Sequence, residues 1–297
     1  MELGEYQREA QKTDQFKKQD RVVPLLGMGG EVGSLLAEYK KWMRDGEAHV
    51  LFPEQVAEEL GDILWYLANT ATKFDLDLDA IAAQNLAKTR DRWPPDGPEP
   101  VYRLFDADYL ASEQLPRRFT AEIREENGKG SKARIVLTID GVAAGDPLQD
   151  NSYDPDGYRF HDVFHLAHAA KLGWSPVLRG KLLKRKQEDP PDRKRRSDEE
   201  VNEVEDGGRA IVTDEAVVAY VWGYAKRHRF LEGVTTVDYR VLKTVKDFTG
   251  GLEVKARSGH QWEEAILAGY DVWRQVNERR GGVIEVDLEE RRIELVG

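Results

Sequence analysis

The run Trp93-Pro94-Pro95-Asp96-Gly97-Pro98 divides the sequence at a point that neither a helix nor a strand can cross. Each proline lacks the amide hydrogen that regular structure requires, and glycine adds backbone freedom. Before this run the apolar residues repeat with helical spacing, whereas alternating segments appear after it. The sequence therefore predicts two domains, residues 1–97 and 98–297, which a chain of 297 residues can accommodate.

The first domain is predicted to be entirely helical. Helices are expected over residues 5–20, 22–44, 54–74 and 77–92, and Arg44-Asp45-Gly46 should end the second of them. That second segment contains four glycines, which are poor helix formers, so close packing against another helix should compensate for them. The glycines are Gly27, Gly29, Gly30 and Gly33.

The second domain mixes helices with short hairpins. Residues 117–125 and 132–140 alternate as strands do, with Asn127-Gly128-Lys129-Gly130 between them, and residues 282–286 and 291–295 should form a closing hairpin. Helical patterning covers residues 158–172, 214–231, 239–248 and 261–279. The predicted fold class is mainly α: an all-α bundle followed by an α+β domain with short β-hairpins.

The composition of the chain excludes several kinds of site and makes some partners unexpected. The chain has no cysteine, which excludes disulfides, thiolate metal sites and a cysteine nucleophile. It has no apolar run long enough for a membrane and an acidic N-terminus unlike a signal peptide, so we expect a cytoplasmic protein without a membrane partner. The net charge of -11 makes nucleic acid an unexpected partner. The basic run at 179–196 could bind phosphate or RNA, but a solvated linker that acidic residues neutralise is the favoured interpretation.

Four acidic residues carry the main functional hypothesis. Glu31 and Glu38 are seven residues apart on one predicted helix, and Glu59 and Asp62 are three apart on the next, so each pair shares a helix face. Single pairs of this kind are usually solvent-facing charges. Here the acids interrupt apolar runs, where an acid needs a compensating partner. Carboxylates gathered between two helices would suit Mg²⁺, which can activate water and neutralise phosphate charge.

Three segments resemble the MazG-like nucleotide pyrophosphohydrolase superfamily over roughly residues 5–95. They are Gly30-Glu31-Val32-Gly33-Ser34-Leu35-Leu36-Ala37-Glu38, Glu58-Glu59-Leu60-Gly61-Asp62-Ile63-Leu64-Trp65-Tyr66-Leu67, and Asn85-Leu86-Ala87-Lys88 with Arg90 and Arg92. The resemblance implies a four-helix arrangement built from more than one subunit, a dimer or a tetramer. It also implies Mg²⁺-dependent hydrolysis of nucleoside triphosphates or related nucleotides to the monophosphate and pyrophosphate, with Mn²⁺ as a substitute ion.

The resemblance also assigns residues to roles. Glu31, Glu59 and Asp62 fall on metal ligands, but Ser34 stands where the superfamily has a second acid, and Glu38 one turn later could replace it. Glu58 or Glu59 would orient the attacking water. Phosphate contacts or stabilisation of the departing charge are expected from Lys41, Asn85, Lys88 and Arg92. Asn85 and Lys88 could equally be polar residues at an exposed helix end. A rival hypothesis is a nucleotide-sensing protein with weakened catalysis, whose C-terminal domain binds a partner or RNA.

The second domain contains a histidine cluster. His161, His165 and His168 share one face of a predicted helix, beside Asp162. Such a helix could bind zinc, manganese or iron through His161 and His165, with Glu205, Asp206 or Glu215 adding an oxygen ligand. A polar network between helices is the favoured alternative. Segments 158–165, 172–179 and 205–210 resemble the C-terminal domain found in one subgroup of MazG-like proteins. Candidates for a second site are Arg159, His161, Asp162, His165, Glu205, Asp206 and Arg209.

Overall fold

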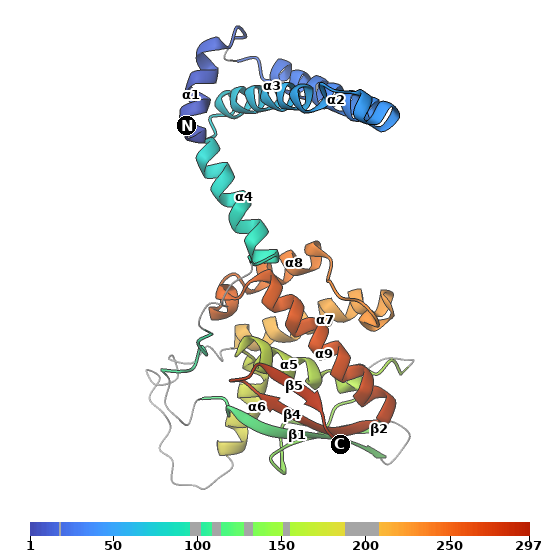
Figure 1. Ribbon diagram of the computed structural model, residues 1–297. Helices are drawn as coiled ribbons and strands as arrows, with labels where there is room; N and C mark the ends of the chain where they lie inside the picture. Colours follow the sequence, from blue (N-terminus) through green and yellow to red (C-terminus); the bar gives the residue numbers. More distant parts are fainter. Residues whose placement is uncertain (18, 96–101, 109–113, 128–132, 151–154, 188–207) are drawn as a thin grey trace. The chain divides into compact units, whose positions relative to one another are not determined.

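The computed structural model (Figure 1) describes residues 1–297 except 18, 96–101, 109–113, 128–132, 151–154 and 188–207. The chain divides into two compact units, Met1–Arg90 and Asp91–Gly297. Within the described ranges, no helix combines the length and the apolar character needed to cross a membrane. The fold class is confirmed: the structure is mainly α, with an α+β region.

The first unit consists of α1 (Leu3–Thr13), α2 (Val22–Asp45), α3 (Phe52–Lys73) and α4 (Leu78–Arg92). Helix α1 ends seven residues earlier than predicted. The Asp14 carboxylate accepts a hydrogen bond from the Phe16 amide and lies 2.7 Å from the Lys73 ammonium, which turns the chain away from the helix. Helix α2 ends as predicted at Gly46, whose φ of 58° favours glycine.

Helices α2 and α3 pack against each other along their length (Figure 1). The predicted close contact occurs at one of the four glycines. A Cβ atom on Gly27 would lie 2.2 Å from Cε1 of the Tyr66 ring, whereas Gly29, Gly30 and Gly33 face open space in this chain. Gly27 therefore allows Tyr66 to seat directly on the α2 backbone.

The hydrophobic core of the first unit is thin. Among its described residues, the buried cluster comprises Ala10, Ala68, Ala71 and Leu78, with Tyr6 and Trp65 packed beside it. Helices α2 and α3 leave many large apolar side chains exposed: Leu25, Leu26, Val32, Leu36, Tyr39, Trp42, Met43, Leu60 and Leu67. An apolar surface of this extent is typical of an interaction site.

The second unit contains an antiparallel sheet of β1 (Arg118–Asn127), β2 (Ala133–Ile139), β3 (Val142–Ala143), β4 (Gly281–Asp287) and β5 (Arg292–Leu295). The described strands run in the order β3-β2-β1-β4-β5. Strand β1 pairs with its predicted partner β2, with Ile123 opposite Leu137, and β4 pairs with its predicted partner β5, with Val286 opposite Ile293. Strand β1 also pairs with β4, with Ala121 opposite Ile284, which the sequence did not predict. Both predicted hairpins are therefore present, and their strands are neighbours in one sheet.

The helices of this unit form the main core together with the sheet. They are α5 (Asp162–Leu172), α6 (Pro176–Gln187), α7 (Gly208–Arg227), α8 (Tyr239–Thr249) and α9 (Gly259–Arg279). Helices α5 and α9 pack against each other and contact β4 and β5 (Figure 1). Helix α6 was not predicted, because its basic residues read as part of a charged linker. Its first turn is fixed by Ser175, whose hydroxyl accepts a hydrogen bond from the Leu178 amide.

Candidate functional site

Acidic side chains from α2 and α3 meet in the first unit. Burial and the neighbouring Glu31 carboxylate raise the pKa of Glu59, and hydrogen bonding to Glu31 adds to the effect. The charges of Asp62 and Glu58 raise it further. Glu59 is therefore surrounded by like charges, an arrangement that a divalent cation would relieve. Glu31, Glu59 and Asp62 fit a magnesium site on this chemistry.

Glu38 has a different environment. It is buried, and its carboxylate accepts hydrogen bonds from the Lys41 ammonium and from His49 Nε2, the latter at 2.9 Å. The Lys41 bond is the first cause of a lowered pKa of Glu38. Two cationic or hydrogen-bonding partners already stabilise this carboxylate without a metal ion. Lys41, which was expected to contact the substrate, is therefore paired with Glu38.

The remaining predicted residues of the first site are exposed or have other partners. Glu58 is exposed on α3, and Asn85 and Lys88 are exposed on α4. Arg92 belongs to the second compact unit, where its guanidinium stacks 4.6 Å from the Trp93 ring centre and 5.2 Å from that of Tyr239. These contacts hold Arg92 by cation–π interactions rather than by an anion.

A second polar cluster lies within the core of the second unit. Its histidines come from the start and the middle of α5, and its acids come from the second turn of α7. The Nε2 atoms of His161 and His165 lie 3.8 Å and 3.4 Å from Oε2 of Glu215. His165 Nδ1 lies 3.1 Å from Oδ2 of Asp214. The structure thus brings together two of the predicted histidines and the acid Glu215.

Asp214 is the centre of this cluster, and the sequence reasoning missed it. The side chain is fully buried; it accepts hydrogen bonds from His168 Nδ1 and the Ser175 hydroxyl, both at 2.9 Å, and from the Val177 amide at 3.4 Å. The signal was present, since Asp214 interrupts the apolar run 210–218 in the same way that Glu59 interrupts its own.

The buried His165 and Asp214 shift each other's pKa strongly. Burial favours neutral His165, but Asp214 and then Glu215 outweigh it and raise its pKa to about 10. Burial also opposes ionisation of Asp214, yet His165 and His168 hold its pKa well below the ordinary range. Burial lowers the pKa of His161 and keeps that imidazole neutral.

Other predicted residues of the second site have separate partners or lie outside the described residues. Asp162 is buried and accepts a hydrogen bond from Lys181. Arg159 Nη1 lies 2.6 Å from Asp150 Oδ2 and its Nη2 lies 3.7 Å from Glu125 Oε2, so these acids, not the histidines, bind it. Arg209 is exposed. Glu205, Asp206 and most of the basic run 179–196 fall outside the residues whose side chains the structure describes.

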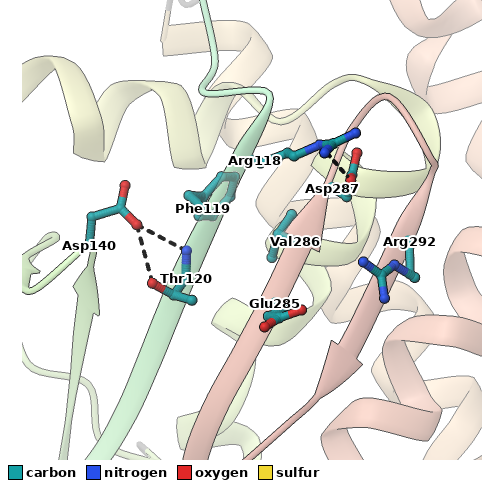
Figure 2. Close-up of a pocket in the computed structure, with 8 residues that line it drawn as sticks. All are labelled: Arg118, Phe119, Thr120, Asp140, Glu285, Val286, Asp287 and Arg292. Carbon is teal, nitrogen blue, oxygen red and sulfur yellow. Dashed lines mark hydrogen bonds and ion pairs between the residues drawn. The ribbon is translucent and has the colours of Figure 1, made fainter.

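A shallow depression of about 300 Å³ on the sheet is shown in Figure 2. Arg118 and Arg292 are among the residues that line it. Arg118 Nε is 2.8 Å from Asp287 Oδ2, and Asp140 accepts hydrogen bonds from the Thr120 amide and hydroxyl (Figure 2). Arg292 pairs with Glu294, which lies outside the lining. None of the predicted site residues lines this depression.

Comparison with known proteins identifies the family of the larger part of the chain. Residues 100–297 match the MazG C-terminal domain, which therefore covers the sheet and the histidine cluster. The chain belongs to the MazG C-terminal domain family. The resemblance to MazG-like proteins carrying this domain is thus confirmed, and it suggests a function related to nucleotides.

A curated relative and the solved structures add less. The Gene 37 protein of Mycobacterium phage L5 is 32% identical over 69 residues, which is 23% of this chain. The chain spans 60% of that relative's length. No solved structure matches the chain significantly. The geometry of the MazG C-terminal domain must therefore be interpreted from its own residues.

Proposed function

We propose that the first unit is a Mg²⁺-dependent nucleoside triphosphate pyrophosphohydrolase. Water would form a bond to the α-phosphorus, the bond to the α–β bridging oxygen would break, and the products would be the monophosphate and pyrophosphate. The observation that carries the proposal is the position of Glu59, whose neighbours Glu31, Asp62 and Glu58 are all acidic. Repulsion among these carboxylates supports a divalent cation as their normal partner.

Glu31, Glu59 and Asp62 would hold the magnesium ion. A magnesium ion held there would supply positive charge against the phosphates and make a coordinated water more acidic. Glu58 lies exposed on α3, a position from which a carboxylate could accept a proton from water. Asn85 and Lys88 on α4 are exposed and could contact phosphate oxygens. Glu38, with its own cationic partners, is the weakest of the proposed ligands.

The decisive experiment measures pyrophosphate release by the full chain across a panel of ribo- and deoxyribonucleoside triphosphates with Mg²⁺. The double variant Glu59→Gln/Asp62→Asn should lower turnover by about a thousandfold or more, since metal-assisted stabilisation is worth several kcal/mol. Glu54→Gln, an exposed acid in the first turn of the same helix, is the matched control and should retain activity.

Two outcomes would contradict the proposal. Full activity in the double variant would refute the ligand assignment. Tight binding of one nucleotide without turnover of any would instead support a nucleotide-sensing protein, in which Ser34 in place of an acid has weakened catalysis. Circular dichroism of each variant would separate a lost ligand from a lost fold.

We also propose that the first unit assembles as a homo-oligomer, a dimer or a tetramer. The support is the imbalance between its thin buried cluster and the exposed apolar side chains of α2 and α3. Light scattering should show a multiple of the chain mass. Leu26→Glu/Leu36→Glu should reduce that mass, whereas Val212→Glu, an exposed apolar residue of the second unit, should not. A wild-type monomer would contradict the proposal.

A further inference from the structure

Helix α5 has almost no solvent-facing side, which makes its polar residues unusual. Ten of its eleven residues are buried, including Asp162, His165 and His168. Buried imidazoles and carboxylates are stable only when other groups satisfy them. The buried imidazole nitrogens of α5 therefore need either hydrogen-bond partners or a bound metal ion.

Three atoms converge at one point between α5 and α7. His161, His165 and Glu215 each offer one ligand atom, and these three atoms all lie within 4.8 Å of one another. The two nitrogen-to-oxygen separations are 3.8 Å and 3.4 Å. Ligand atoms about 2.1 Å from a tetrahedral zinc ion are about 3.4 Å apart. The cluster already has nearly the dimensions of a zinc site.

The opposite nitrogens of both rings are held in the way that metal-binding histidines require. His161 Nδ1 lies 2.8 Å from the Tyr158 carbonyl oxygen, which can only accept, so Nδ1 carries the proton and Nε2 presents its lone pair. His165 Nδ1 lies 3.1 Å from the Asp214 carboxylate. Carbonyl and carboxylate partners of this kind orient histidine ligands and make them more basic.

His165 lies between two acids, Asp214 and Glu215. Its side chain is 2% exposed, and within the described part of the chain neither ring nitrogen makes a well-aligned hydrogen bond. The nearby acids Asp162, Asp214 and Glu215 outnumber the ammonium group of Lys181, which pairs with Asp162. A divalent cation that displaced the proton of His165 would balance these charges in its place.

We propose that His161, His165 and Glu215 bind one divalent transition metal ion, with Zn²⁺ as the preferred ion. Two imidazoles and one carboxylate are a ligand set that zinc uses when a fourth position stays open. The Glu215 side chain is 42% exposed, so the open position faces solvent. Water, or an anionic oxygen such as that of a phosphate group, would take it. This site lies in the second unit and is independent of the function proposed for the first.

The test uses the full chain loaded with Zn²⁺ and desalted, with bound metal measured by mass spectrometry and ligands identified by X-ray absorption at the zinc edge. Imidazole scattering distinguishes this site from the all-carboxylate site of the first unit. We expect one imidazole-bound zinc per chain. Glu215→Gln and His161→Gln should each weaken binding at least tenfold.

Matched controls are His260→Gln and Glu232→Gln, which alter more exposed residues of the same unit and should bind zinc as the wild type does. Glu215 is partly exposed, so Glu215→Gln is expected to fold, and near-ultraviolet circular dichroism would verify this. Absence of imidazole-bound zinc from the wild type would overturn the proposal. Equal binding by wild type, folded Glu215→Gln and His161→Gln would overturn it as well.

Discussion

The contact between Gly27 and Tyr66 provides a sharp test of the α2–α3 packing. In Gly27→Ala the new Cβ atom would lie 2.2 Å from Cε1 and 2.3 Å from Cζ of Tyr66, far inside van der Waals contact. The ring would have to move or the helices would have to separate. Gly29→Ala is the matched control, because a Cβ atom there meets nothing within 4 Å in this chain.

The expected magnitude follows from two opposing effects. Alanine in place of glycine inside a helix gains about 1 kcal/mol at both positions. Overpacking costs about 1–3 kcal/mol, and only Gly27→Ala incurs that cost. The free energy of local opening should therefore be lower in Gly27→Ala than in Gly29→Ala by about 1–3 kcal/mol.

Activity should respond as well, because this contact lies beside the acidic site. Gly27 is one helical turn before Glu31 on α2, and Tyr66 is one turn after Asp62 on α3. Wider spacing of the two helices would separate the carboxylates that are proposed to share the metal. Gly27→Ala should thus reduce Mg²⁺-dependent turnover.

Hydrogen-exchange mass spectrometry of the full chain measures the local effect, since α2 and α3 peptides report on this unit separately from the rest. Tyr66→Leu in the Gly27→Ala background should recover part of the lost protection. Equal protection in Gly27→Ala and Gly29→Ala would show that the helices do not make this contact, and the reasoning would fail.

Three further predictions concern ions and buried polar groups. Free Mg²⁺ at a hundred times its dissociation constant should stabilise the wild type by about 2.7 kcal/mol but not Glu59→Gln/Asp62→Asn, which thermal unfolding would reveal. Lys73→Ala should lower the free energy of unfolding by about 3–5 kcal/mol, because Asp14 would lose its buried cation. Lys73→Arg keeps the charge and should lower it less, which urea unfolding of both variants would measure. Ser175→Ala should cost about 1–2 kcal/mol in the same assay, since the helix cap and a hydrogen bond to Asp214 disappear together, and an unchanged midpoint would contradict both roles.

The elements that the sequence predicted well are those with strong periodicity and clear end signals. Helix α2 ends at Gly46, and both hairpins pair over the alternating segments. Helix α6 was missed because basic residues dominate its sequence and its apolar contacts are tertiary. The early end of α1 depends on Asp14 meeting Lys73, a contact that joins residues far apart in the sequence.

The candidate sites show the same limit. Helical spacing placed His161, His165 and His168 on one face, and the structure brings them to the acids Glu215 and Asp214. Spacing within one helix did not link Asp214 to these histidines, because Asp214 meets them only when α7 packs against α5. Spacing also grouped Glu38 with Glu31. In the structure, Glu38 instead pairs with Lys41 and with His49.

Asp214 constrains how this domain can vary. Asp214 belongs to α7, and its carboxylate contacts His165 and His168 of α5 and accepts a hydrogen bond from Ser175, which precedes α6. A neutral replacement would strand several buried polar groups at once, each costing about 1–3 kcal/mol. Substitutions here should be acceptable only in coordinated sets, so the three helices must diversify together at this point or not at all.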